Sequence, residues 1–236
     1  FNMLKIFDEI QKNLLNVLFP VFCNGCSNLL LKNENVICTK CIHNLPFTCH
    51  HNIKETEIDK VFYGIVPFEF AASILYFTKK GISQNLIHNL KYRNRQEIGT
   101  YLGDLYAKEI LNLETIQTID LIIPVPLHKK KFHERGYNQV TTFCKAIEKN
   151  LAIPVLDDVL VKKQHLKSVT NKSKESRLEH NKNVFSIENQ HKIEGKHVLI
   201  VDDVFTTGAT IEACAKEILK IKNTKISILT MAYSQS

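Results

Sequence analysis

The sequence predicts an α/β fold, in which a parallel sheet flanked by helices follows a small cysteine-rich module. Strand-like and helical segments alternate from about residue 120 onward, an order typical of parallel sheets with helices on their faces. Residues 197–201 form an unbroken, largely apolar run, as in strands that are buried on both faces. Two closely spaced cysteine pairs near the N-terminus predict the module. We therefore expect an N-terminal helix and cysteine module over 1–60 and the α/β domain over 61–236.

Length and composition fit this division. The chain has 236 residues, which suits one large domain or a medium domain with a small attachment. Hydrophobic residues make up 44% and charged residues 23%, a balance that excludes global disorder. The net charge of +7 favours anionic partners such as phosphates or nucleic acid. A lysine-rich surface without such a partner would give the same charge.

The first twenty residues predict an amphipathic helix. Apolar side chains recur at helical spacing from Leu4 to Leu18, and Asp8, Glu9 and Lys12 interrupt them. The segment lacks the features of a signal peptide, and no apolar stretch reaches the ~20 residues of a membrane helix. We expect it to pack on the protein or a partner, with contact to a membrane surface as the alternative. We also expect a cytoplasmic protein, where reduced cysteine pairs indicate metal binding rather than disulfides.

The cysteine module has the spacing of a zinc site. Cys23 and Cys26 form one pair, Cys38 and Cys41 the other, and each pair can place two thiolates on a tight turn. Gly25 is expected to supply a residue that tolerates positive φ. Four thiolates give the closed tetrahedral site of structural zinc, and the metal would contribute much of the folding free energy of so short a segment. The alternatives are reduced core cysteines or a redox role.

Three further metal-ligating residues follow directly. Cys49, His50 and His51 leave open whether a second metal site exists. Cys144 and Cys214 lie in helical patterns and are expected in the core.

Hydrophobic periodicity outlines the remaining elements. Strands are expected over 61–68 and 71–77 as an antiparallel pair, and over 120–125, 153–156, 159–161, 196–201 and 226–232. Helices are expected after Gly81 through Leu90 and over 96–111, 137–149 and 208–221. The polar, basic stretch 162–183 is too long for an ordinary connection, which indicates a mobile functional loop or a disordered insertion.

An acidic pair and a small-residue loop follow the clearest strand. Asp202 and Asp203 would repel each other in an apolar interior, so a compensating partner is needed. Vicinal ribose hydroxyls fit, because an ionised carboxylate only accepts hydrogen bonds and a diol offers two donors. The residues 206–210 are small enough for backbone N–H groups to surround a phosphate at a helix start. This pattern predicts a ribose-phosphate site; the alternative is a strand end before a threonine-capped helix.

The string VLIVDDVFTTGAT, residues 198–210, resembles the signature of the type I phosphoribosyltransferases. Two further stretches, 124–128 and 135–139, are similar to the hallmark of the ComF family of competence-associated proteins, as is the motif 90–93. The resemblance covers essentially the whole chain. It implies a five-stranded parallel sheet with a hood, preceded by a zinc ribbon.

The resemblance also implies a ligand, phosphoribosyl diphosphate with Mg²⁺, the metal being held largely by substrate oxygens and water. Asp202 and Asp203 would bind the ribose hydroxyls, and Arg177 would act from a loop that closes over the reacting centre. The 5-phosphate would lie on Thr206, Thr207, Gly208, Ala209 and Thr210. Candidates for the diphosphate side are His128, Lys129, Lys130, Lys131, Arg135, Asn138 and Gln139.

Three functions are compatible with these features. The first is an enzyme that transfers the phosphoribosyl group to a nitrogen nucleophile, in association with DNA uptake. The second is a single-stranded-DNA-binding protein of natural competence. The third is a sensor that binds phosphoribosyl diphosphate without turning it over. The sequence shows no recognisable pocket for the nucleophile that would accept the phosphoribosyl group. It also identifies neither catalytic residues nor an oligomeric state.

Overall fold

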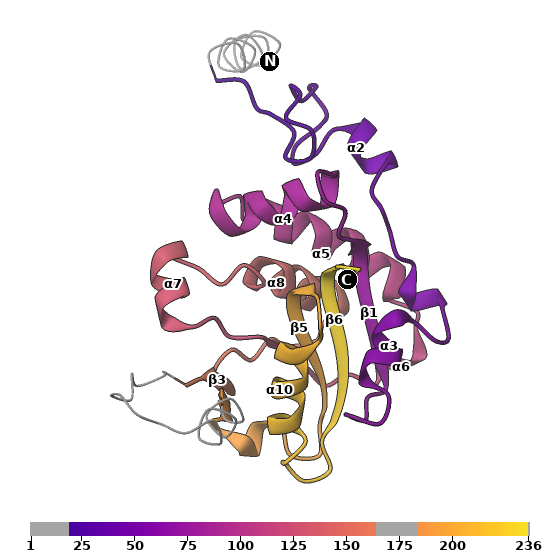
Figure 1. Ribbon diagram of the computed structural model, residues 1–236, viewed down its shortest axis with the longest axis vertical. Coiled ribbons are helices and arrows are strands. Elements are labelled where there is room, and N and C mark those ends of the chain that lie inside the picture. Colours follow the sequence, from indigo (N-terminus) through magenta and orange to yellow (C-terminus); the bar gives the residue numbers. More distant parts are fainter. Residues whose placement is uncertain (1–18, 164–183, 236) are drawn as a thin grey trace, which may run out of the picture.

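The computed structural model describes residues 19–163 and 184–235. Its centre is a four-stranded parallel sheet with the strand order β1-β6-β5-β2 (Figure 1). The strands are β1 (Phe70–Tyr76), β2 (Leu121–Pro124), β5 (His197–Phe205) and β6 (Lys225–Tyr233). The predicted α/β class, a parallel sheet flanked by helices, is confirmed.

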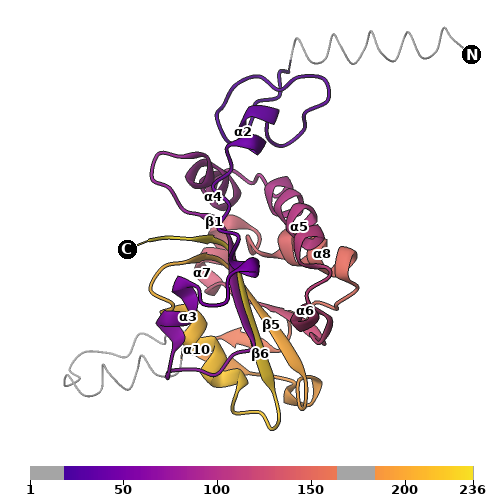
Figure 2. The same cartoon turned by 90° about the vertical axis from the view of Figure 1, so that its right-hand side faces the viewer.

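Helices cover both faces of the sheet (Figure 2). On one face lie α5 (Glu97–Ile110) and α8 (Thr141–Leu151), and on the other α3 (Glu57–Phe62) and α10 (Ala209–Ile218), whereas α4 (Ile82–Tyr92) lies over one end of the sheet. Alternate residues of β5 divide accordingly, because side chains alternate along a strand. Leu199 packs with the first group and Ile200 with the second. Burial on both faces explains the unbroken apolar run that the sequence shows.

Shorter elements complete the described chain. Val155 forms a parallel bridge with Ile122, so a single bridge stands beside β2 where the resemblance implies a fifth strand. β3 and β4 form a separate antiparallel pair. The short elements are α2 (Thr39–His43), η1 (His50–Asn52), α6 (Glu114–Gln117), α7 (Lys129–Arg135), β3 (Leu160–Lys162), β4 (Phe185–Ile187) and η3 (Gln190–Lys192).

The expected antiparallel strand pair at 61–68 and 71–77 is wrong. Thr56 begins helix α3 with a capping box, in which its side chain accepts from the Asp59 amide and the Asp59 carboxylate accepts from the Thr56 amide. Capping therefore outweighs the β-like composition around Val61. The second expected strand does form, as β1, but it pairs in parallel with β6.

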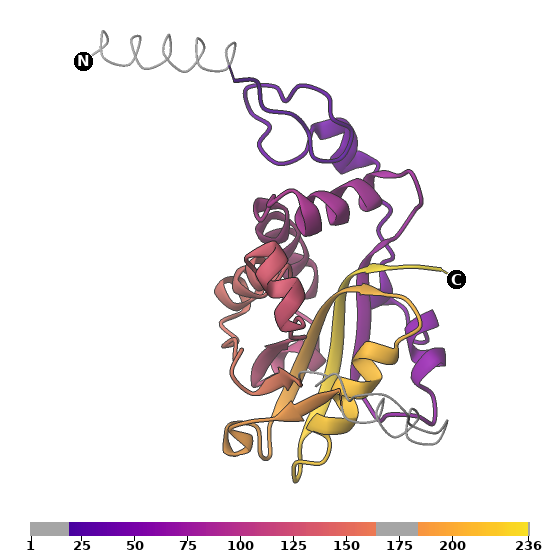
Figure 3. The ribbon, with the colours of Figure 1, turned by 60° about the vertical axis from the view of Figure 1, so that its left-hand side comes forward.

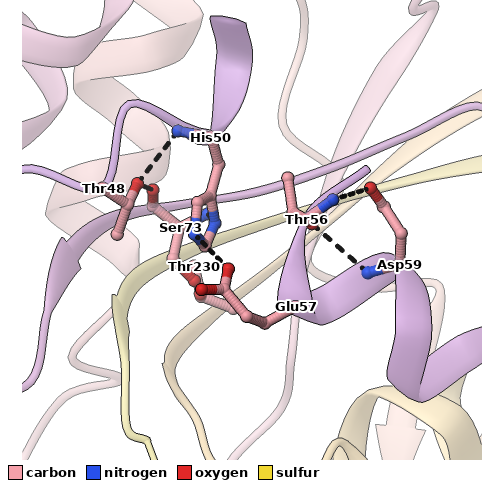
Figure 4. A network of polar contacts seen from close by, with 7 residues as sticks. All are labelled: Thr48, His50, Thr56, Glu57, Asp59, Ser73 and Thr230. Carbon is pink, nitrogen blue, oxygen red and sulfur yellow. Dashed lines mark hydrogen bonds and ion pairs between the residues drawn. The ribbon is translucent and has the colours of Figure 1, made fainter. Parts of the chain in front are cut away.

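The segment 46–50 covers the free edge of β1. Phe47 bridges Leu75, Thr48 donates its amide to the Ile74 carbonyl, and His50 Nδ1 accepts the Ser73 amide at 3.3 Å. Figure 4 shows the His50 ring beside Glu57, with Nε2 and Oε2 3.2 Å apart. An uncovered edge would leave unpaired backbone groups, so this segment protects the sheet.

The cysteine module and α4 stand at the end of the molecule to which the strands point (Figure 3). The side chains of Asn85 and Asn89 on α4 donate to the carbonyls of Gly25 and Asn24, at 2.7 and 3.0 Å. Ligands of parallel α/β sheets bind beyond the carboxyl ends of the strands. The module is thus fixed to the helix that borders this end. No helix of the described ranges has the length and apolar character needed to cross a membrane.

Candidate functional site

The four cysteines of the two pairs come together. The Sγ atoms of Cys23, Cys26, Cys38 and Cys41 all lie within 4.8 Å of one another. A tetrahedron with Zn–S bonds of 2.3 Å places its sulfurs ~3.8 Å apart, and Cys26 and Cys38 are separated by 3.6 Å. The cluster could therefore hold a metal ion such as zinc.

Backbone amides prepare one of these thiols for a metal. Cys23 Sγ accepts hydrogen bonds from the amides of Gly25 and Cys38, at 3.3 and 3.2 Å. Burial alone would raise the pKa of Cys23, but hydrogen bonds from these amides and from the Cys26 amide lower it to about 7. Burial and the neighbouring thiols raise the pKa of Cys41. One thiol is thus readily ionised, and a cation would be needed to ionise the whole set.

Glycine is needed in the first pair for space and not for positive φ. A Cβ on Gly25 would lie 2.9 Å from Cys41 Sγ and 3.0 Å from a methyl carbon of Ile82. The positive φ of this turn, 61°, belongs to Ser27. The expected role of Gly25 is therefore corrected, and its absent side chain lets the two pairs approach each other.

Cys49, His50 and His51 do not converge. The His50 ring packs edge-on against Tyr76 of β1 and Tyr233 of β6, whereas the His51 ring packs against Tyr106 of α5. Within the described ranges, the four-cysteine cluster is the one group of metal-ligating side chains with suitable spacing. The structure thus gives no geometric support to a second metal site here.

The acidic pair lies near the carboxyl end of β5. The strand was expected to end at Val201, but it continues to Phe205, because β6 pairs with it along this stretch. Asp202 is partly buried and Asp203 is buried. The Asp203 amide donates to Asp202 Oδ1 at 2.8 Å. Burial, and after it the charge of Asp203, raises the pKa of Asp202 to about 7.

Asp203 has two polar side-chain partners from distant parts of the chain. Lys91 Nζ, at the end of α4, lies 2.8 Å from Oδ1. Gln139 Nε2, in the loop before α8, donates to Oδ2. Gln139 in turn accepts from Arg135 Nη1 at 2.6 Å. The charge of Asp203 is therefore compensated by one direct cation and one relayed cation.

The loop after β5 makes a sharp turn into α10. Gly208 has φ of 77°, which favours glycine, and a Cβ there would lie 2.9 Å from the Phe205 ring. Phe205 is itself fixed by edge-on contact with Phe62. The side chains around this turn, Thr206, Thr207, Ala209 and Thr210, are exposed. The start of α10 thus faces solvent, with the positive end of its dipole available to an anion.

Of the seven diphosphate-side candidates, Lys129, Lys130 and Lys131 are exposed at the start of α7. The other four divide into two groups. Arg135 and Gln139 belong to the network of Asp203. His128 and Asn138 support the backbone: His128 Nδ1 accepts the Lys130 amide at 3.2 Å, and Asn138 donates to the Val125 carbonyl at 2.9 Å. His128 thus caps α7, the helix that carries Arg135, and Asn138 holds the segment that follows this helix.

Arg177 lies outside the described residues, as do almost all of the polar stretch 162–183 and the predicted N-terminal helix. The flanks of the stretch are adjacent, because the Lys163 amide donates to the Val184 carbonyl at 2.9 Å.

A cationic cavity borders the acidic pair, and sequence reasoning did not identify it. It has a volume of about 460 Å³. Tyr92 is 66% exposed there, and the Arg135 guanidinium carbon lies 5.2 Å from its ring centroid. The motif 90–93 was the available signal, but the pairing of Lys91 with Asp203 depends on tertiary structure. The lining residues are Lys91, Tyr92, Arg93, Asn94, Lys131, Glu134, Arg135 and Tyr137.

Comparison with known proteins agrees with this architecture. Residues 141–236 match the phosphoribosyl transferase domain family. DNA utilization protein YhgH of Shigella flexneri is 32% identical over 201 residues, covering 84% of each chain. Competence protein ComFC of Bacillus subtilis is 29% identical over 90% of this chain and 84% of its own. Competence protein F of Haemophilus influenzae is 28% identical over 62% of this chain and 66% of its own.

Proposed function

The chain belongs to the ComF family of competence-associated proteins, and on that premise we propose that it binds phosphoribosyl diphosphate with Mg²⁺. In this proposal Asp202 and Asp203 accept hydrogen bonds from the ribose hydroxyls, and the loop 206–210 takes the 5-phosphate. Arg135 and Gln139 face the diphosphate. The four cysteines hold a structural zinc ion.

One observation carries the proposal. The acidic pair at the end of β5 and the exposed N-terminus of α10 are joined by the tight turn at Gly208. Carboxylates that can accept from hydroxyls and a helix start that suits a phosphate are adjacent, at the edge where ligands of parallel sheets bind, and this supports the proposal. A ribose with a phosphate on its 5-carbon presents both groups that this edge would recognise.

Mg²⁺ fits the donor set of this edge. Magnesium prefers oxygen ligands and keeps several waters, so one or two carboxylates and the oxygens of a diphosphate are sufficient. Of the two carboxylates, Asp202 is the one that accepts only a backbone hydrogen bond, from the Asp203 amide, among the hydrogen bonds of the described residues. It would neutralise part of the ion's charge directly or through water.

Isothermal calorimetry with phosphoribosyl diphosphate and Mg²⁺ tests this proposal. Binding should be lost when Asp202 and Asp203 are both changed to Asn. The chain offers a matched control in the exposed pair Asp157 and Asp158, because the same double change there removes the same charge. Equal affinity of the wild type and the Asp202→Asn, Asp203→Asn variant would refute the site.

Transfer of the phosphoribosyl group needs a separate test. Diphosphate release should be measured with a panel of nitrogen nucleophiles, including bases and amines. Release that depends on one nucleophile would identify an enzyme and its acceptor. Tight binding without release across the panel would instead favour the sensor.

Single-stranded DNA is the second candidate ligand. The names of the relatives refer to competence and DNA utilization. Single-stranded nucleic acid binds to exposed aromatic rings flanked by cations, and Tyr92 with Arg135 and its cationic cavity supplies both features. A second cavity of about 360 Å³ adjoins it through Arg93 and reaches Phe22 of the cysteine module. We propose this surface as a path for a DNA strand.

Fluorescence anisotropy with a labelled oligothymidylate tests the path. Affinity should fall steeply with salt, because phosphate contacts release counterions. Tyr92→Ala should weaken binding by ~1–3 kcal/mol, the usual contribution of one stacked base. Tyr63→Ala is the control, since Tyr63 is 89% exposed and lies outside the cavity. Equal losses in both variants would contradict the path.

A further inference from the structure

Two connections run from the cationic cavity to a single carboxylate. Lys91 lines the cavity and pairs directly with Asp203 Oδ1. Arg135 lines the cavity and reaches Asp203 Oδ2 through Gln139. Cations that face an anion-binding surface are thus held by the carboxylate that the proposed function assigns to the ribose.

The pairing of Lys91 and Asp203 is partly screened from water. The side chain of Asp203 is 10% exposed and that of Lys91 is 19% exposed. A carboxylate offers about four acceptor positions, and Lys91 and Gln139 already donate to it. A ribose diol would therefore have to share both carboxylate oxygens with these donors, and removing Lys91 would free Oδ1.

We infer that Lys91 is a positioning residue shared between the two sites: it holds Asp203 in the free protein and turns to a phosphate group when one enters the cavity. The ammonium group has three donors on a flexible stem, so the change requires only side-chain rotation. Occupation of the cavity then releases Asp203 for the ribose hydroxyls. The two binding events assist each other, and by thermodynamic linkage the effect is reciprocal.

The cavity recognises phosphate oxygens, which have two possible sources. One is the diphosphate end of the same phosphoribosyl ligand, and the other is the backbone of a DNA strand. Arg93, Lys131 and Arg135 supply further positive charge in either case. This inference rests on the proposed function, since it requires ribose hydroxyls to bind at Asp203.

Dividing the ligand into its two ends tests the coupling. Calorimetry measures the affinity for ribose 5-phosphate under three conditions. These are no added anion, saturating inorganic diphosphate, and saturating oligothymidylate. We expect at least a fivefold gain with one of these anions, the lower end of typical coupling between sites. The anion that gives the gain identifies the source. No gain with either anion would overturn the inference.

Variants assign the coupling to Lys91. The gain should vanish in Lys91→Met and be retained in Lys131→Met, because Lys131 lines the cavity and has no contact with Asp203 among the hydrogen bonds and ion pairs of the described residues. Lys131→Met should only weaken diphosphate binding. A gain that persists in Lys91→Met would contradict the role of Lys91.

A measurement on the wild-type chain covers the case in which Lys91→Met does not fold or ribose 5-phosphate binds too weakly. With ¹³C-labelled lysine, the Lys91 side-chain resonance should shift when diphosphate or oligothymidylate is added, and Lys91→Arg provides its assignment. A resonance that moves with neither anion would overturn the inference. If phosphoribosyl diphosphate itself binds while Lys91 stays in place, only the coupling fails; if it does not bind, the proposed function fails.

Discussion

Lys91 Nζ lies 2.8 Å from Asp203 Oδ1, although 112 positions separate the two residues in the sequence. The contact joins the end of α4 to the end of β5. Since α4 also carries the asparagines that hold the cysteine module, the module, the cationic cavity and the acidic pair share one helix. The module and the acidic pair thus contact the same helix, through Asn85 and Asn89 on the one hand and through Lys91 on the other.

The first prediction concerns metal content. The protein should contain close to one zinc ion per chain by elemental analysis, and Cys38→Ser should lose it, because three thiolates leave the tetrahedral site open. Chelation should lower thermal stability, since the metal contributes to the folding of the module. Cys49→Ser is the control, because Cys49 is exposed and outside the cluster. Full zinc content in Cys38→Ser would contradict the site.

The second prediction concerns pH and Asp202. Its pKa is raised to about 7 by burial and then by the charge of Asp203. The folded state therefore holds the proton more tightly than the unfolded state, and this contribution to stability is lost as pH rises toward 7. Asp202→Asn should gain in free energy of unfolding relative to the wild type between pH 5 and pH 8. Urea titrations measure this difference, and a pH-independent one would be evidence against the raised pKa.

The third prediction concerns the covered edge of β1. His50→Leu removes the acceptor of the buried Ser73 amide, and an unsatisfied buried donor costs ~1–3 kcal/mol. Glu57→Gln preserves an acceptor opposite Nε2 on a partly exposed side chain and should cost less than ~1 kcal/mol. Urea unfolding at neutral pH compares the two. Similar losses for both would show that the Ser73 contact does not determine the effect.

The sequence was sufficient to predict those elements whose structure is determined by residues close to one another in the chain. β-Branched runs predicted β2, β5 and β6, and cysteine spacing predicted the cluster, because both depend on neighbouring residues. The pattern failed around Val61, where a capping box from Thr56 and Asp59 begins a helix. It also could not place His50 at the edge of β1.

The candidate site likewise combines features that neighbouring residues determine with features that depend on tertiary packing. The acidic pair and the small-residue loop are contiguous, so the sequence predicts their arrangement on β5 and α10. The ion pair of Lys91 and the position of Tyr92 beside Arg135 depend on how α4 packs over the sheet. No spacing along the chain encodes that packing, so the motif 90–93 could be noticed but not interpreted.

A crystal structure of the protein with phosphoribosyl diphosphate and Mg²⁺ tests the account most directly. The account predicts ribose hydroxyls within hydrogen-bond distance, ~2.5–3.0 Å, of the Asp202 and Asp203 carboxylates. It also predicts the 5-phosphate on the backbone amides of 206–210. A ligand bound elsewhere, or with its ribose turned away from both carboxylates, would contradict it.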